Sequence, residues 1–226
     1  PAMVTNYCTP NGFLTERYME YMEEKARGGW GLLITEDYAV CEHGKGYERI
    51  PGLWKDEHVE LNKELTKRVH KHGSMIFCQM YHPGRQSNHN INGNVMPLAP
   101  SGTKDPMCMD LAREMTIEEI HQLVKDFAMA AKRCKEAGFD GIELHCAHGY
   151  LLAEFLSSYV NKRTDEYGGC FDNRVRIVEE ILKAMREQVG GFPIQVRISG
   201  NEYVQGGRTE AETYQLARRL EQIGFD

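Results

Sequence analysis

The chain has 226 residues and a mass of 25.9 kDa, long enough for a large domain with its own core and too long for a peptide hormone or a disulfide-stapled miniature. Hydrophobic residues make up 41%, and no apolar run approaches the length of a membrane-spanning helix. With 33 acidic and 27 basic side chains, the net charge of −6 has the wrong sign for binding phosphate backbones or anionic membranes. We therefore expect neither nucleic acid nor a membrane as a partner.

The seven cysteines are scattered along the chain, and no two of them form a CxxC pair. This spacing excludes a zinc-ribbon or thioredoxin-type motif. An odd number of scattered thiols, with no basic and apolar leader at the start, is typical of a reducing compartment. We therefore predict a cytoplasmic location.

The predicted elements alternate between amphipathic helices and short apolar strands. In chain order they are a helix from Thr15 to Gly28, a strand at 31–37, a helix at 55–72, a strand at 75–82, a helix at 116–137, a strand at 141–146, a helix at 173–188, a strand at 194–199 and a helix from Thr209 to Gly224. Capping boxes, Thr116 with Glu119 and Thr209 with Glu212, mark two helix starts. This alternation is typical of α/β folds with parallel strands.

The loops that follow the strands are long, at 38–54, 83–115 and 147–172, whereas the helix-to-strand links are short. Loops after the strands form the active site in (β/α)8 barrels, and doubly wound sheets also bind ligands at the carboxyl ends of their strands. Four strands with steady repetition favour the barrel. The segment 136–140 (Glu-Ala-Gly-Phe-Asp) leads into a strand, and the similar segment 222–226 (Gln-Ile-Gly-Phe-Asp) has no strand after it in this sequence. We therefore expect residues 1–226 to form one partial TIM barrel that contains about strands 2 to 5 and is truncated at both ends.

Polar residues alternate with apolar ones along two of the predicted strands. Glu143 and His145 do so in the strand 141–146, and Gln195 and Arg197 in the strand 194–199. A parallel strand buried on both faces is ordinarily apolar throughout. Because an unpaired buried polar group costs about 1 to 3 kcal/mol, these side chains must bond to one another or to a ligand. The sequence alone does not distinguish an internal hydrogen-bond network of these side chains from a site at which they bind a ligand.

Candidate catalytic residues follow the strand 141–146. His145 and His148 can converge only if the chain turns between them, and Gly149 permits such a turn. Tyr150 has a phenol that is protonated at neutral pH and can donate a proton. Two histidines at a strand end could also be metal ligands, joined by His82.

Two further residues suit a ligand with mixed polarity. Gln79 carries a donor and an acceptor, which fit an imide or amide edge, and Arg197 offers a fixed cation for a developing anion. Structural alternatives are a core hydrogen bond for Gln79, and a pairing of Arg197 with Glu143 or Glu36.

These residues together resemble the old yellow enzyme family of flavin oxidoreductases. The resemblance is carried by residues 145–151, which read His-Cys-Ala-His-Gly-Tyr-Leu, by the block 161–174, and by the segments 1–3, 28–36, 79–85 and 196–199 in the same order. It covers essentially the whole chain. The most similar branch includes bacterial 2,4-dienoyl-CoA reductase, 2-enoate reductases and bile-acid-pathway enone reductases.

The resemblance implies a (β/α)8 barrel that binds FMN noncovalently at the carboxyl ends of its strands. By similarity, Ala2 and Met3 would lie along the flavin and Gln79 would meet its pyrimidine edge. Arg197 would lie near its N1 and C2 carbonyl. Position 37 is usually small in the family, so Asp37 would either bring a carboxylate near the flavin or turn away, and Val4 would offer only its backbone amide.

The implied activity is reduction of the C=C bond of an α,β-unsaturated ketone, acid or thioester, with NAD(P)H as reductant. His145 and His148 would hold the substrate carbonyl oxygen, and Tyr150 would protonate the α-carbon. The FMN phosphate site, and the 4Fe-4S cluster and FAD of larger members, would belong to regions beyond this chain. The oligomeric state is open, with a homo-oligomer as one option.

Two other functions compete with this prediction. One is a metal-dependent barrel hydrolase with His145, His148 and His82 around zinc, which leaves Gln79 and Tyr150 without a role. The other is an inactive flavin-enzyme relative that serves as an interaction subunit, against which the intact candidate residues argue.

Overall fold

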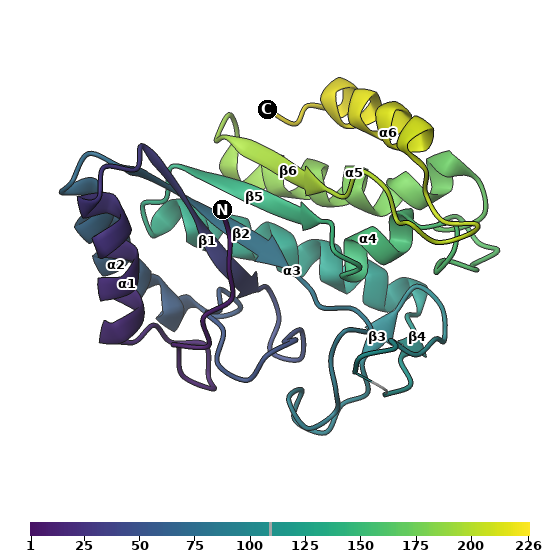
Figure 1. Ribbon diagram of the computed structural model, residues 1–226, viewed down its shortest axis with the longest axis horizontal. Helices are drawn as coiled ribbons and strands as arrows, with labels where there is room; N and C mark the ends of the chain where they lie inside the picture. Colours follow the sequence, from purple (N-terminus) through teal and green to yellow (C-terminus); the bar gives the residue numbers. More distant parts are fainter. Residues whose placement is uncertain (109) are drawn as a thin grey trace.

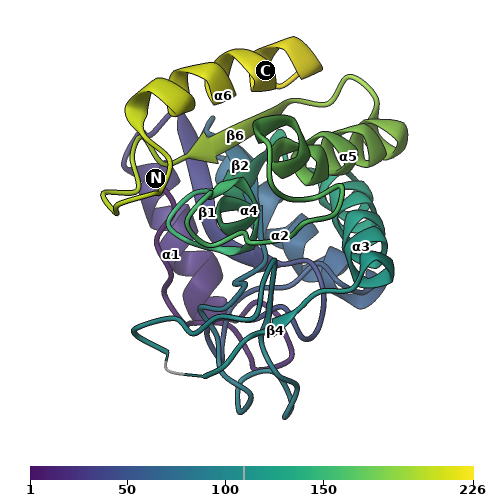
Figure 2. The same ribbon diagram turned by 90° about the vertical axis from the view of Figure 1, so that its right-hand side faces the viewer.

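The main sheet of the protein contains four parallel strands. The computed structural model describes residues 1–108 and 110–226. The sheet order is β1 (Leu32–Ala39), β2 (Met75–Tyr81), β5 (Gly141–Cys146) and β6 (Ile194–Ile198). Strands that follow one another in the chain are neighbours in the sheet, without the reversal of strand order found in doubly wound sheets. Figures 1 and 2 show the helices arranged along the outer side of the curved sheet, which confirms the partial (β/α)8 barrel.

Five long helices precede, connect or follow these strands. They are α1 (Glu16–Arg27), α2 (Val59–His70), α3 (Ile117–Glu136), α5 (Phe171–Val189) and α6 (Glu210–Ile223), with a 3-10 turn at Asp56–His58 before α2. Their apolar faces pack on the sheet around fully buried residues such as Leu65, Phe127, Ile142 and Ile181. Within the described residues, no helix is both long and apolar enough to cross a membrane.

One of the two predicted capping boxes is only half formed. At α3 the Thr116 hydroxyl and the Glu119 carboxylate each bond the other residue's backbone N–H, as predicted. At α6 the Thr209 side chain accepts from the Glu212 N–H, but the Glu212 carboxylate forms an ion pair with Arg174 at 2.5 Å. A tertiary ion pair has therefore replaced the local bond that the sequence pattern favours.

The structure also contains elements that periodicity did not predict. The helix α4 (Leu151–Leu156) lies in the loop after β5, and all six of its residues are buried. In the loop after β2, the short strands β3 (Leu98–Ala99) and β4 (Arg113–Glu114) pair in parallel. Both elements are too short for a periodic pattern to stand out, and both depend on tertiary contacts.

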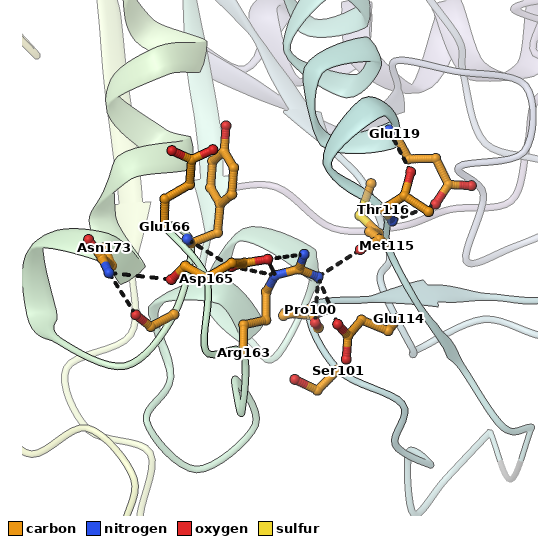
Figure 3. Close-up of polar contacts among 12 residues, drawn as sticks. Pro100, Ser101, Glu114, Met115, Thr116, Glu119, Arg163, Asp165, Glu166 and Asn173 are labelled. Carbon is orange, nitrogen blue, oxygen red and sulfur yellow. Dashed lines mark hydrogen bonds and ion pairs between the residues drawn. The ribbon is translucent and has the colours of Figure 1, made fainter.

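Arg163 ties together the long loops that follow β2 and β5. Its guanidinium donates to the carbonyl oxygens of Pro100 (3.0 Å) and Met115 (2.7 Å) and pairs with the Asp165 carboxylate at 2.6 Å. Figure 3 shows this side chain lying between the segment that carries Asp165 and the segments that carry Pro100 and Met115. We call this set of contacts the Arg163 latch. It is buried, and it fixes one loop of the functional face against the other.

Candidate active site

A row of polar residues crosses the sheet at one level. The strand register places Asp37 opposite Gln79, Gln79 opposite Glu143, and Glu143 opposite Gln195. Side chains at matched positions of neighbouring strands lie close together on one face. The four strands therefore bring polar groups together at one level of the sheet.

A bulge in β1 decides which acidic residue joins this row. The register shifts by one residue between Ile34 and Asp37, so that Asp37 rather than Glu36 faces Gln79. A shift of one residue exchanges the two faces of a strand. Glu36 instead accepts hydrogen bonds from the backbone N–H and the hydroxyl of Thr5, at 3.0 and 2.5 Å.

Glu143 is the centre of the hydrogen-bond network in this row. Its carboxylate accepts from Gln79 Nε2 (2.6 Å), Gln195 Nε2 (2.6 Å) and Arg197 Nε (2.7 Å). The polar residues of β5 and β6 thus form an internal network, and Arg197 takes Glu143 rather than Glu36 as its partner. Among the described residues, Gln79 Oε1 and Arg197 Nη1 have no hydrogen-bond partner and are free for a ligand.

His145 and His148 converge as predicted, because the chain turns sharply after β5. His148 itself has φ +60° and Gly149 has φ +76°, both in the left-handed region. Two side chains from other elements hold the His148 backbone: its N–H donates to Ser199 Oγ at 3.0 Å, and its carbonyl accepts from Gln86 Nε2 at 2.7 Å. The positive φ favours glycine at position 149, where a Cβ would also lie 2.6 Å from Gln86 Nε2 and push it away from the His148 carbonyl.

The hydrogen bonds fix where the protons of these histidines lie. The backbone N–H of Ala147 donates to His145 Nδ1 at 3.2 Å, so neutral His145 carries its proton on Nε2. His145 Nε2 lies 3.2 Å from His148 Nδ1, which therefore accepts. Neutral His148 then has its own proton on Nε2, where no described residue accepts it.

Tyr150 lies against His145, with ring centroids 5.0 Å apart in an edge-on arrangement. Its hydroxyl is 3.3 Å from the hydroxyl of Tyr47, a residue of the loop after β1. Sequence reasoning missed Tyr47, because it lies in a loop without periodicity and belongs to none of the motifs. Its only signal is its place in a long loop on the functional face.

The seven residues that the resemblance assigns to the flavin and the substrate line one cavity of about 510 Å³. They are Ala2, Met3, Gln79, His145, His148, Tyr150 and Arg197. Asp37, Val4 and Tyr47 line the same cavity, so Asp37 does bring its carboxyl group into the site. A second cavity of about 370 Å³, between the loops after β5 and β6, meets the first at His148.

Burial favours the neutral forms of His145, His148, Tyr150 and Asp37 in the cavity. It lowers the pKa of His145 to about 3, helped by the nearby His148 and Arg197, and burial and then Arg197 lower the pKa of His148. Burial, and then repulsion by Asp37, raise the pKa of Tyr150. Burial, followed by Glu36 and Glu143, raises the pKa of Asp37 to about 7.

The zinc alternative lacks a ligand set in the part of the chain that the structure describes. Residues 1–108 and 110–226 contain no group of three or more His, Cys, Asp or Glu side chains that could hold a metal ion. His82 is buried, and its Nδ1 accepts from the Gly84 N–H at 3.2 Å. Its ring is thus engaged in the turn after β2.

Comparisons with known proteins agree with this arrangement. The NADH oxidase of Thermoanaerobacter brockii is 41% identical over 226 residues, which cover 99% of this chain and 35% of that protein. Among solved structures, a 2-naphthoyl-CoA reductase complex matches with a TM-score of 0.94 at 33% identity, over 99% of this chain and 36% of that one. The old yellow enzyme homologue of Zymomonas mobilis matches with a TM-score of 0.91 at 32% identity, over 99% of this chain and 66% of that one.

This chain therefore spans about a third of the length of the NADH oxidase and of the 2-naphthoyl-CoA reductase. The family model described as NADH:flavin oxidoreductase / NADH oxidase matches residues 1–226, the whole of the chain. The chain belongs to this family, that of the old yellow enzymes.

Proposed function

We propose that the whole protein binds FMN in the 510 Å³ cavity and reduces the C=C bond of an α,β-unsaturated carbonyl compound, with NADH or NADPH as reductant. The convergence of His145, His148 and Tyr150 beside Gln79 and Arg197 carries this proposal. Family membership and relatives named NADH oxidase and 2-naphthoyl-CoA reductase support it. We also propose a cytoplasmic location, on the pattern of its cysteines.

The free groups of the cavity fit a flavin. Gln79 leaves its amide oxygen as an acceptor and Arg197 leaves Nη1 as a charged donor, a combination that suits the imide edge of an isoalloxazine ring. Ala2, Met3 and Val4 line the same cavity with small or apolar side chains, which suit the ring face. When bound, FMN supplies the hydride that adds to the β-carbon of the substrate.

The residues of this chain would stabilise the charge that develops on the substrate. Hydride addition places negative charge on the carbonyl oxygen, and His148 can donate to that oxygen from Nε2, where its proton lies. His145 can join as a second donor if its ring rotates, so that the Nε2–H leaves His148 and faces the substrate. Both histidines are neutral, so they donate hydrogen bonds without needing a counter-ion.

Tyr150 would supply the proton that completes the reaction at the α-carbon. Its raised pKa keeps the phenol protonated over the whole working range, and its hydroxyl contacts Tyr47, through which the proton could be replaced. Removal of such a general acid ordinarily costs about 10² to 10⁴-fold in rate.

The visible spectrum of the purified full-length protein tests this function. We expect flavin absorption that is bleached by NADH or NADPH without oxygen and restored by an α,β-unsaturated ketone, an enoate or an enoyl thioester. The corresponding saturated ketone is the control and should leave the flavin bleached. A colourless protein, or a bleached one that no unsaturated carbonyl compound reoxidises, would contradict the proposal.

A further inference from the structure

Asp37 is the group of the cavity to which the mechanism above gives no role. It lies near the end of β1, after the bulge, and lines the 510 Å³ cavity although only 4% of the residue is exposed. No N–H or O–H group of the described residues donates a hydrogen bond to its carboxyl oxygens. A buried carboxylate without donors is costly, so its neutral form is favoured.

The groups that face Asp37 come from all four strands. Glu36 precedes it on β1 and Glu143 lies on β5, and both repel a negative charge there. Arg197 of β6 attracts it, but Arg197 is paired with Glu143. Tyr81 of β2 and Tyr150 of the loop after β5 are neutral phenols whose pKa values an ionised Asp37 raises further.

His145 does not serve as the partner of this carboxyl group. Its Nε2 lies 3.9 Å from Asp37 Oδ1, beyond hydrogen-bond distance, and that nitrogen carries its own proton, which points to His148. The proton of a neutral Asp37 therefore has no acceptor on His145. The open side of Asp37 is the cavity itself.

We propose that Asp37 is a proton-linked binding residue, whose neutral carboxyl group donates a hydrogen bond to a carbonyl oxygen of the flavin or of the substrate, so that ligand binding takes up a proton. The inference rests on the proposed function, because the ligand is the one proposed there. Its physical basis is linkage: a ligand that prefers neutral Asp37 raises the pKa of this group. The factor by which the ligand lowers the acid dissociation constant of Asp37 equals the factor by which protonation lowers the Kd of the ligand.

A pH dependence of binding follows. The free carboxyl group, with its pKa of about 7, is largely neutral at pH 6.5 and largely ionised at pH 8.5. The ligand-bound protein must take up the lost proton at the higher pH, so the Kd should rise by about 25-fold from pH 6.5 to pH 8.5 if Asp37 stays neutral in the complex. In Asp37→Asn the amide donates at every pH and cannot ionise, so the Kd should not vary in this way.

Isothermal titration of the full-length protein in two buffers of different ionisation enthalpy measures the proton uptake directly. One arm adds FMN to the apoprotein, and the other adds 2-cyclohexen-1-one to the oxidised holoenzyme. At pH 7.5 we expect wild type to take up about half a proton or more in one arm, which identifies the ligand that Asp37 contacts. Asp37→Asn, or Asp37→Ser if the first variant folds poorly, should take up none.

Glu154→Gln is the matched control. Glu154 is also a buried carboxyl group with a raised pKa, but it lines the second cavity and not the first, so its replacement should leave proton uptake unchanged. Ligand binding without proton uptake in either arm, or uptake that persists in Asp37→Asn, would overturn the inference and leave the proposed function intact. If FMN does not bind at any pH, the proposed function fails, and the inference fails with it.

Discussion

The histidines of the cavity form a directed chain of hydrogen bonds. It starts at the Ala147 backbone N–H, passes through His145 and ends at His148, so every proton in it points the same way. Because a backbone amide cannot act as an acceptor, the chain cannot reverse while both rings stay neutral. The N–H at His148 Nε2 is therefore the end of the chain and is available to donate a hydrogen bond to a ligand in the cavity.

Removal of the Tyr150 hydroxyl should affect the proton step alone. We predict that Tyr150→Phe slows substrate reduction by about 10²-fold or more while the Kd for FMN changes less than about twofold, since the ring and its packing stay in place. Stopped-flow reoxidation of the reduced enzyme measures the rate. Tyr47→Phe is the control, with a loss of only a few-fold, and an equal loss in both variants would contradict the assignment of Tyr150.

The raised pKa of Asp37 also has a consequence for stability. The pKa is higher in the folded protein, about 7, than in the unfolded chain, near 3.8, so ionisation as the pH rises destabilises the fold between these values. We predict that Asp37→Asn gains about 2 to 3 kcal/mol over wild type between pH 5 and pH 8. Urea unfolding of the apoprotein at both pH values measures the gain, and a constant difference would contradict it.

The elements show which features of the fold can be read from sequence. The strand 141–146 was predicted to the residue, because a glycine and an apolar alternation bound it on both sides. The helix α4 was missed, since its six buried residues carry no period of their own. The first predicted strand ended at Asp37, whereas β1 continues to Ala39, because the bulge restores its pairing with β2.

The candidate site was predictable in part for the same physical reason. Residues at the ends of parallel strands meet at one edge, so Gln79, His145 and Arg197 could be expected together. The bulge at Thr35 and Glu36 could not be expected, since no local signal separates a bulged strand from a regular one. The contact of Tyr47 with Tyr150 likewise depends on how a long loop folds.

The Arg163 latch should stabilise the loops of the functional face. We predict that Arg163→Lys lowers the free energy of unfolding by about 2 to 4 kcal/mol, because one ammonium group cannot replace a planar fork that reaches two carbonyl oxygens and a carboxylate. Urea denaturation of the full-length protein measures the change. Arg176→Lys, which exchanges an exposed contact with the Glu166 carbonyl, is the control and should cost less than about 1 kcal/mol. Equal losses in the two variants would contradict the role of the latch.

At the scale of the whole molecule, the sheet of this chain has two open edges. Among the described residues, β1 and β6 each have one neighbouring strand in the sheet, apart from a single bridge between Ala39 and Gly52 at the end of β1. Edge strands with free N–H and C=O groups associate with other chains. We predict that residues 1–226 produced alone form oligomers and do not retain FMN. Size-exclusion chromatography with an absorbance spectrum measures both, and a yellow monomer of this length would contradict the prediction.

The Arg163 latch also bears on how the loop after β2 can change in sequence. The latch binds Pro100 and Met115 through their main-chain carbonyl oxygens, and Lys162 uses its own backbone N–H to bond Ser101 Oγ at 2.8 Å. Main-chain carbonyls are present whatever the side chains are. The loop after β2 can therefore change its side chains at positions 100 and 115 without losing the carbonyl oxygens that Arg163 binds, whereas a change of Ser101 removes the contact with Lys162.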